Sequence, residues 1–359
     1  AVALGAQIGR SECGLEVLRD VTPEAVARAR DYLAADAVSV ALKEGISETL
    51  YVEVHCTAGG RRAEAVIAGS HTRFVYLACD GEVVLDRRTG ASSREEERCV
   101  PLTLRRVFDY ALTAPIDELA FIDEARRLNM AAAELALGGE YGHSLGRTLR
   151  GRRELHVMGD SLFSRMLAYT SAACDARMAG AMVPVMSNSG SGNQGIAATV
   201  PVAVYARQTG ASEERTRRAL VLSHLTAIYI KQSLGRLSAL CGCVVAATGS
   251  SCGIAYLMGG GYREVACAVQ NMIANLTGMI CDGAKPSCAL KVSSGVSTAV
   301  MSALLAVEGK CVTSAEGIID DDVDRSIRNL TAIGREGVAA TDRLVLDIMT
   351  HKKPADCER

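Results

Sequence analysis

Apolar and polar residues alternate along the first quarter of the chain, which is the pattern of strands that bury one face. The clearest run places one set of side chains on one face and their neighbours on the other: Leu50, Val52, Val54 and Cys56 against Tyr51, Glu53 and His55. Similar runs follow at residues 63–67, 73–78 and 82–85, and the turn Asp80-Gly81 separates the last two. These runs predict a small antiparallel sheet.

Helical signals flank the predicted sheet. Thr22 offers a hydroxyl cap and Pro23 suits the first helical position, so a helix is expected to begin there. Residues 1–100, including a charged linker at 86–98, are therefore expected to form a small α+β domain. After the linker the apolar positions recur at helical spacing, so residues 101–359 are expected to form one large, mostly helical domain. The predicted fold class is α+β.

Several helices can be placed within the second domain. One is expected to open at Pro115, another to cover residues 154–173 and a last one to lie near 341–349. The long uncharged runs at 241–262 and 265–281 are interrupted by Gly, Ser and Asn or Gln. We therefore expect buried helices rather than membrane spans there.

Composition and charge narrow the class of protein. The chain has 359 residues, of which 49% are hydrophobic and 22% charged, with a net charge of −2. It is therefore expected to be globular and not to bind nucleic acid, which requires a basic face. The thirteen cysteines and an opening stretch without a cleavable-leader pattern favour the reducing cytoplasm. The opening AVALGAQIG resembles the middle of an element, so we expect a fragment or a processed chain.

Cysteine and glycine concentrate in residues 241–291, which hold six of the thirteen cysteines. Cys241, Cys281 and Cys288 are the candidate metal ligands, and Cys243 is close enough to Cys241 to exchange roles with it. By spacing alone these residues fit either buried packing or thiolate ligands of an inorganic centre. Three thiolates on a [4Fe–4S] cluster would leave one iron open as a Lewis acid.

The polar stretch SNSGSGNQG at residues 187–195 is the candidate substrate-binding loop. It offers neutral donors and acceptors suited to a small zwitterion, and it lacks the lysine of a phosphate-binding loop. A polar turn that joins two helices is the alternative interpretation. The candidate binding residues are Ser187, Asn188, Ser189, Ser191, Asn193 and Gln194.

His224 and Lys231 are the candidate catalytic residues. They are seven positions apart, so on a helix both point to the same face, where they could move protons or pair with a carboxylate. A hydrogen-bonded histidine in a helix contact and a surface lysine are the structural alternative. Asp175 and Arg177 are expected to form a surface ion pair near the polar loop.

Three stretches in this order resemble the L-cysteine desulfidase family, which is related to the alpha domain of iron–sulfur L-serine dehydratases: VPVMSNSGSGNQG, SHLTAIYIKQSLGRLSALCGC and NMIANLTGMICDGAKPSCALK. The resemblance covers nearly the whole chain, from about residue 14. It implies an oxygen-sensitive [4Fe–4S] cluster on Cys241, Cys281 and Cys288. It also implies α,β-elimination of L-cysteine to hydrogen sulfide, ammonia and pyruvate, with the amino acid held by the polar loop.

The chain departs from that family at one motif. Members carry an N-terminal Gly-Cys-Thr-Glu-Pro motif, which does not occur in these 359 residues. We therefore expect a homo-oligomer or a separate chain that supplies the segment, and a small amino acid, L-cysteine or L-serine, as the ligand. Three alternatives stay open: an L-serine dehydratase, a non-catalytic relative, and a zinc site at the same cysteines.

Overall fold

The structure is a computed structural model, and it describes residues 2–46, 48, 50–88, 100–235, 238 and 240–352. Val100–Asp342 forms one compact unit, and the chain on either side of it is assigned to a second unit. Within the described residues there are one four-stranded antiparallel sheet and fourteen α-helices, so the predicted α+β class is confirmed.

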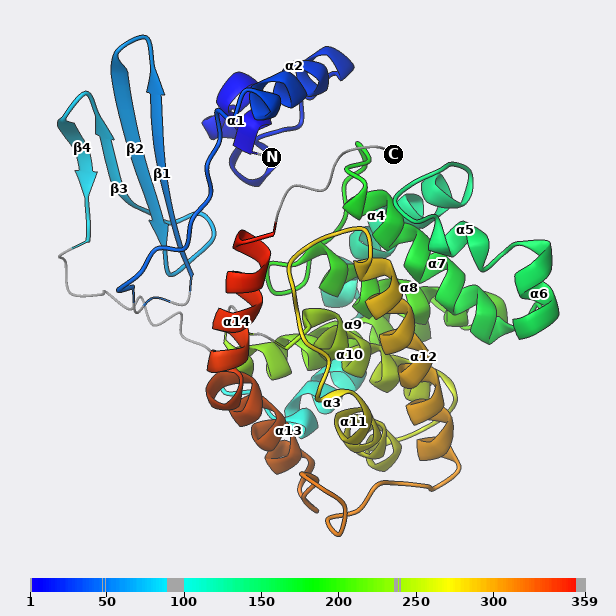
Figure 1. Cartoon of the computed structure of the whole chain (residues 1–359). Helices are drawn as coiled ribbons and strands as arrows, with labels where there is room; N and C mark the ends of the chain where they lie inside the picture. Colours follow the sequence, from blue (N-terminus) through cyan, green and yellow to red (C-terminus); the bar gives the residue numbers. More distant parts are fainter. Residues whose placement is uncertain are drawn as a thin grey trace. The chain divides into compact units, whose positions relative to one another are not determined.

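The sheet belongs to the smaller unit and is a simple meander, with neighbouring strands paired in chain order (Figure 1). Two expected features are confirmed. The Ala25 N–H donates to Thr22 Oγ1 at 3.2 Å and so caps the first predicted helix. Asp80 and Gly81 both have positive φ, as in the tight turns of hairpins. In the smaller unit, the elements that precede Val100 in the chain are α1 (Val2–Ile8), a 3₁₀ segment (Ser11–Glu16), α2 (Pro23–Ala34), β1 (Tyr51–Ala58), β2 (Arg61–Ala68), β3 (Phe74–Cys79) and β4 (Glu82–Asp86).

The larger unit is built around α10 (Figure 1). This helix packs against α8, α9, α11 and α12, and nearly all of its residues are buried. The elements from residue 104 onward are α3 (Leu104–Thr113), a 3₁₀ segment (Ile116–Leu119), α4 (Ile122–Leu137), α5 (Leu145–Thr148), α6 (Arg152–Met158), α7 (Leu162–Met178), α8 (Gly192–Thr209), α9 (Glu213–Leu234), α10 (Gly242–Leu257), α11 (Tyr262–Leu276), α12 (Cys288–Val307), α13 (Val323–Ala332), a π-helical turn (Ile333–Gly337) and α14 (Ala339–Thr350).

Small residues allow α10 to sit at this position. A Cβ atom added to Gly249 would stand 2.2 Å from the Ser223 carbonyl oxygen of α9, far inside van der Waals contact. The two helix backbones therefore touch at Gly249, and only glycine fits there. The same close approach explains why a helix so rich in Gly, Ala and Ser can be almost fully buried.

The prediction of a single helix over residues 154–173 is wrong, because two helices, α6 and α7, occupy that stretch. Gly159 has a φ of +70°, which interrupts the chain after α6. Ser161 then starts α7 with a capping box: the Ser164 N–H donates to Ser161 Oγ at 3.1 Å and Ser164 Oγ accepts from the Ser161 N–H. The apolar period continues across the break, which is why the pattern alone suggested one helix.

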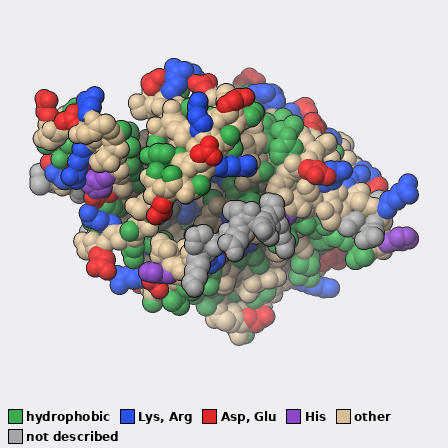
Figure 2. All heavy atoms as spheres, turned by 45° about the horizontal axis from the view of Figure 1, so that its top comes forward, with side chains coloured by type: hydrophobic (Ala, Val, Ile, Leu, Met, Phe, Trp, Pro, Cys, Tyr) green, Lys and Arg blue, Asp and Glu red, His purple; other side chains and the backbone are tan. Residues whose placement is uncertain are grey.

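The remaining expectations concern surface and linker segments. The charged linker at 86–98 lies mostly outside the described residues. The uncharged runs form α10 and α11, whereas α12 is the described helix that by length and hydropathy could cross a membrane. Half of its most apolar window is buried, as in the core helix of a globular unit. On the face drawn in Figure 2, basic and acidic side chains are interspersed.

Candidate functional site

The polar loop is a tight turn that leads directly into α8. Asn188 and Ser191 exchange two backbone hydrogen bonds of 3.0 Å, and the residues between them, Ser189 and Gly190, both have positive φ. A non-glycine residue such as Ser189 is uncommon in this conformation, so the surrounding contacts hold the turn in shape. Asn188 is buried, with 4% of its surface exposed.

A buried network joins this turn to α9. The Asn188 side-chain amide donates to His224 Nδ1 and to the His224 carbonyl, both at 3.1 Å. His224 Nε2 lies 2.9 Å from Thr199 Oγ1, and that hydroxyl donates to the Gly195 carbonyl at 2.6 Å. Since the hydroxyl hydrogen is already used, His224 carries its proton on Nε2 and donates it to Thr199.

The environment of His224 also fixes its charge. Burial lowers the pKa of His224 to about 4, so the imidazole is neutral near pH 7. Both ring nitrogens are engaged within the protein. The arrangement is that of a histidine that holds Asn188 and the turn in place.

Asn129 of α4 extends the network and was not anticipated from the sequence. Its amide donates to Thr199 Oγ1 at 3.0 Å, and its oxygen accepts from the Met186 N–H at 2.9 Å. The segment that enters the polar loop is therefore anchored to α4 as well as to α9. A lone asparagine among apolar helix residues was the only signal in the sequence, and such a residue is often merely a helix contact.

A cavity of about 260 Å³ opens beside the network. It is lined by Ser187, Asn188, Ser189 and His224 together with apolar side chains of α4 and α9. Its size and mixed lining suit a molecule no larger than a small amino acid. Four of the predicted site residues therefore share one cavity.

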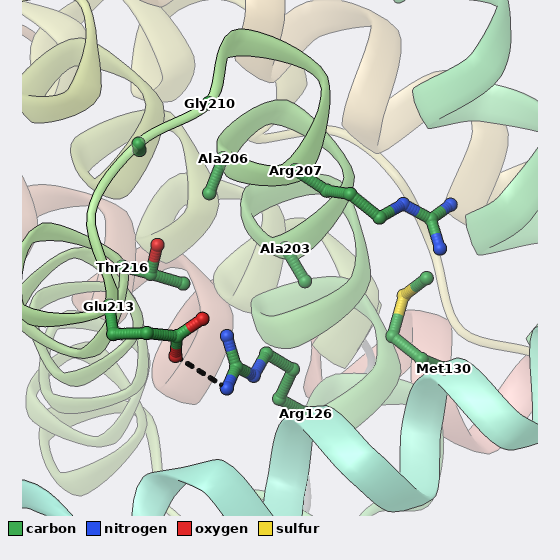
Figure 3. A pocket seen from close by; sticks show the side chains of 9 residues that line it. Arg126, Met130, Ala203, Ala206, Arg207, Gly210, Glu213 and Thr216 are labelled. Carbon is green, nitrogen blue, oxygen red and sulfur yellow. Dashed lines mark hydrogen bonds and ion pairs between the residues drawn. The ribbon is translucent and has the colours of Figure 1, made fainter.

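A larger cavity of about 370 Å³ lies elsewhere in the helical unit, between α4, α8 and α9 (Figure 3). Arg126 and Glu213 point toward one another across it and form an ion pair of 2.7 Å. Its charges are thus largely satisfied within the protein. None of the residues predicted from the sequence lines this cavity.

The three candidate cysteines come from two segments, and two of them stand at helix starts. Cys241 caps α10, and Cys288 is the first residue of α12. The Cys241 N–H donates to the Met279 carbonyl at 2.9 Å, next to the antiparallel bridge of Leu240 with Ile280, so Cys241 lies against the segment that leads into Cys281. Burial raises the pKa of Cys281, and negative charge on Cys241 or Cys288 would raise it further.

Further thiols surround these three. The Cys243 thiol donates to Cys241, which lowers the pKa of Cys241 and raises that of Cys243, and Lys291 favours the Cys241 thiolate further. Cys174 of α7 is completely buried, and besides burial the charges of Cys288 and Cys241 raise its pKa. Sequence spacing did not reveal Cys174, because it approaches the others only through the packing of α7 on α12.

The separation of the candidate ligands bears on the kind of metal centre that they could hold. Among the described ranges, no three His, Cys, Asp or Glu side chains are close enough to bind one ion. The zinc alternative therefore gains no support, since four ligands would have to stand about 2.0–2.3 Å from the metal. In a [4Fe–4S] cluster each thiolate binds a different iron, so the three thiols can stand further apart.

Lys231 and Gln194 link the cysteines to the rest of the site. Lys231 is buried two helical turns after His224, about 10 Å along α9. Burial lowers its pKa, and the nearby charge of Cys281 partly opposes that effect. Gln194 packs on the backbone beside Cys241, because a Cβ atom on Gly242 would stand 2.6 Å from its Nε2 atom.

The predicted site residues therefore fall into two neighbouring groups. Ser187, Asn188, Ser189 and His224 line the smaller cavity, whereas Gln194 and Lys231 lie near the cysteines. The other two loop residues have structural partners: Ser191 closes the turn with Asn188, and Asn193 Oδ1 accepts from Arg177 at 3.1 Å.

The prediction that Asp175 and Arg177 form an ion pair on the surface is wrong. Asp175 is buried, with 1% of its surface exposed, and it accepts from the Gly146 N–H at 2.9 Å. Arg177 turns to Asn193 instead. The two residues are only two positions apart on α7, so they point away from each other.

One further motif resembles a catalytic site but is not arranged as one. Residues 249–253 read GSSCG, which matches the GxSxG pattern of serine hydrolases. Ser251 is completely buried inside α10, and its hydroxyl donates to the Thr248 carbonyl at 2.8 Å. A nucleophile elbow needs a strand-to-helix turn with an exposed hydroxyl, so this serine is part of the helix packing.

Comparison with known proteins matches the chain to one family and to several relatives. The family described as serine dehydratase alpha chain matches residues 12–347. A "UPF0597 protein" of Bacteroides thetaiotaomicron is 68% identical over 352 residues, which cover 98% of this chain and 82% of that protein. Proteins of the same name from Porphyromonas gingivalis and Oleidesulfovibrio alaskensis are 54% and 46% identical, with 98% and 99% of this chain and 83% of each relative covered.

Proposed function

We propose that this chain, which belongs to the serine dehydratase alpha chain family, is an iron–sulfur-dependent lyase that eliminates hydrogen sulfide from L-cysteine. The observation that carries the proposal is the pairing of the chain at Leu240 and Cys241 with the segment that leads into Cys281 and Cys288. A nearby lysine and the N-terminus of a helix both stabilise a negatively charged thiolate. Cysteines that serve only to fill the core need neither of these features.

The cysteines are the residues that would hold the cluster. A [4Fe–4S] cluster on Cys241, Cys281 and Cys288 would supply a Lewis acid, at its iron without a protein ligand, for the thiol or hydroxyl group that leaves the substrate. Lys291 contributes positive charge beside Cys241 and Cys281. Cys243 and Cys174 keep the surroundings of these thiols dry and apolar.

The polar loop would hold the amino acid. Neutral amide and hydroxyl groups of Asn188, Ser189 and Ser187 border the smaller cavity, where they can donate to a carboxylate. His224 positions Asn188 from behind, through the two hydrogen bonds of the Asn188 amide. In this proposal His224 orients the binding residue and does not itself move a proton.

Lys231 would carry the proton transfer. Its burial lowers its pKa, so a larger share of the amine is neutral and able to accept the α-proton of the substrate. It lies near Cys281, next to the atoms that would bind the leaving group. Loss of the α-proton and of the leaving group gives an enamine, which hydrolyses to pyruvate and ammonia.

L-serine is the second candidate substrate, and the family description favours it. Elimination from L-serine releases water where L-cysteine releases hydrogen sulfide, and the other products are the same. The polar loop and Lys231 would act alike on both, since the two amino acids differ only in the leaving group. The ratio of the two specificity constants therefore decides between the candidates.

Pyruvate formation tests this function directly. The full chain, reconstituted anaerobically with iron and sulfide, is expected to form pyruvate from L-cysteine with a higher kcat/KM than from L-serine. Lys231→Met is expected to lower kcat by about 10²–10⁴-fold, the range of a lost general base. The exposed Lys310→Met is the matched control and should retain activity. Cluster-loaded protein that forms no pyruvate from either amino acid would indicate a non-catalytic relative.

A further inference from the structure

Two cysteines that are not candidate cluster ligands, Cys267 of α11 and Cys311 in the segment that follows α12, lie close together. The Cys267 thiol donates to the Lys310 carbonyl at 3.2 Å. One peptide unit joins that carbonyl to Cys311, so Cys267 Sγ is within about 6 Å of the Cys311 Cα atom. The Cys311 thiol donates to Gln270 Oε1 at 3.2 Å, and Gln270 is one helical turn from Cys267. Both thiols therefore lie where this segment meets one face of α11.

A buried side chain holds this segment against α11. Asn271, one turn after Cys267, is 6% exposed. Its Nδ2 atom donates to the Lys310 carbonyl at 3.2 Å, and its Oδ1 atom accepts from the Val312 N–H at 2.9 Å. These two hydrogen bonds lie directly before and after Cys311 in the chain. They therefore fix the backbone of Cys311 beside α11, which keeps its side chain within reach of Cys267.

The two thiols differ in their access to solvent. Cys267 is buried and Cys311 is exposed, and both are free thiols. Burial raises the pKa of Cys267, and the hydrogen bond between its side chain and that of Cys311 raises it further. A reagent in solution therefore meets Cys311 first, and Cys267 is placed to react with whatever Cys311 has bound.

We infer that Cys267 and Cys311 form a reversible, redox-sensing disulfide by exchange with a small-molecule disulfide. The pair does not depend on the proposed function. Cys311 follows the C-terminal end of α12, whereas Cys288 begins that helix, and the helix between them is roughly 30 Å long. The bond would close a covalent loop over residues 267–311, which contains Cys281, Cys288 and all of α12. Oxidation would therefore tie the end of α12 to α11 and restrict the unfolding of this part of the chain.

The exchange proceeds in two balanced steps. Cys311 gives its proton to solvent, and its thiolate attacks one sulfur atom of the small disulfide, whose S–S bond breaks so that the other half leaves as a thiolate. Cys267 then gives up its proton and attacks the Cys311 sulfur of the mixed disulfide, and the second half leaves as a thiolate. The two leaving thiolates take up the two protons. Two protein thiols are thus oxidised, and one small disulfide is reduced to two small thiols.

Oxidised glutathione, used as the sole oxidant, tests the pair. The reduced full chain is held without oxygen in a glutathione buffer in which the exposed Cys56 carries glutathione. Free thiols are then alkylated, the chain is digested, and the peptides are identified by mass spectrometry. The Cys267–Cys311 link is expected to exceed glutathione bound at Cys311 by at least about tenfold, because the second thiol is held nearby and reacts intramolecularly. Dithiothreitol is expected to restore both thiols.

Two variants identify the partners of the link. In Cys267→Ser, the reaction at Cys311 is expected to stop at bound glutathione, because the thiol that would displace it is gone. Cys281→Ser is the matched control, since Cys281 lies in the same tryptic peptide as Cys267, and it should keep the link. Fragmentation of the linked peptides from the wild type identifies both cysteines even if Cys267→Ser does not fold.

Three results in the wild type would overturn the inference. Cys311 could carry glutathione without the link, which would show that Cys267 does not reach it. Cys311 could be linked to a different cysteine, which would show that the pair is wrong. Cys311 could stay a free thiol while Cys56 carries glutathione, which would show that it does not exchange. Each of these results leaves the proposed function standing, because none of them concerns the candidate cluster ligands.

Discussion

At the scale of single residues, His224 shows how a catalytic-looking side chain can serve a binding loop. The imidazole accepts from Asn188 and donates to Thr199, and Asn129 completes the same network from α4. Each of these polar groups is buried, so each depends on the others for its hydrogen bonds. The network therefore contributes to stability as well as to the shape of the loop.

Replacing His224 by leucine tests that contribution. His224→Leu keeps a similar volume but leaves the Asn188 amide and the Thr199 hydroxyl short of a partner. The free energy of unfolding is expected to fall by about 1–3 kcal/mol, the cost of buried unpaired groups. Urea unfolding followed by circular dichroism measures the change, with the exposed His156→Leu as control. Equal stabilities of wild type and His224→Leu would show that the network is not needed for folding.

The same histidine predicts a pH dependence. Its pKa is about 4 in the folded protein because of burial, against 6.5 for the unperturbed side chain. Between these values the unfolded chain binds the proton more readily, so wild-type stability falls as the pH is lowered from 6.5 to 4. The loss due to this group is up to about 3 kcal/mol. It should be missing in His224→Leu, so the gap between the two proteins should narrow over this range; a constant gap would contradict the assignment.

At the scale of elements, the packing of α10 on α9 depends on the absence of a side chain at Gly249. Gly249→Ala forces its methyl group against the Ser223 carbonyl and is expected to destabilise the protein by about 1–3 kcal/mol, the cost of overpacking. Gly278→Ala is the matched control, because a Cβ atom there has no neighbour within 4 Å. Thermal unfolding of both variants measures the difference, and equal melting temperatures would contradict the close contact.

The elements also show what the sequence can predict. The hairpin strands and the turn at Asp80-Gly81 follow from local alternation and backbone preference, and both are observed. The sheet face was not predictable in the same way: Val52 is 51% exposed, while Glu53 is half-buried and accepts from the Tyr51 hydroxyl. Alternation defines two faces but does not decide which one is covered.

Sites that depend on tertiary contacts were only partly predictable. The polar loop stood out by composition, and its tight turn before α8 is observed. The burial of Asp175 and the approach of Cys174 to Cys288 arise from the packing of α7, and no local pattern reports such packing. The break at Gly159 was missed because the apolar period of α7 continues across it.

At the scale of the whole molecule, every residue assigned a role belongs to Val100–Asp342. The family match at residues 12–347 is much longer than this unit, so it also covers the small sheet. The chemistry proposed here therefore depends on one helical unit, in which α12 packs against both α7 and α10, the helices that hold or follow Cys174 and Cys241. The binding of one cluster by Cys241, Cys281 and Cys288 is the central claim.

The most direct test is the iron and sulfide content of the full chain after anaerobic reconstitution. The wild type is expected to hold about four irons and four sulfides, with a broad absorbance near roughly 400 nm. A variant with Cys241, Cys281 and Cys288 all replaced by serine is expected to lose both, whereas Cys252→Ser, which removes a thiol buried within α10, should retain them. A wild-type chain without iron, or a triple variant that binds as much iron as the wild type, would contradict the account.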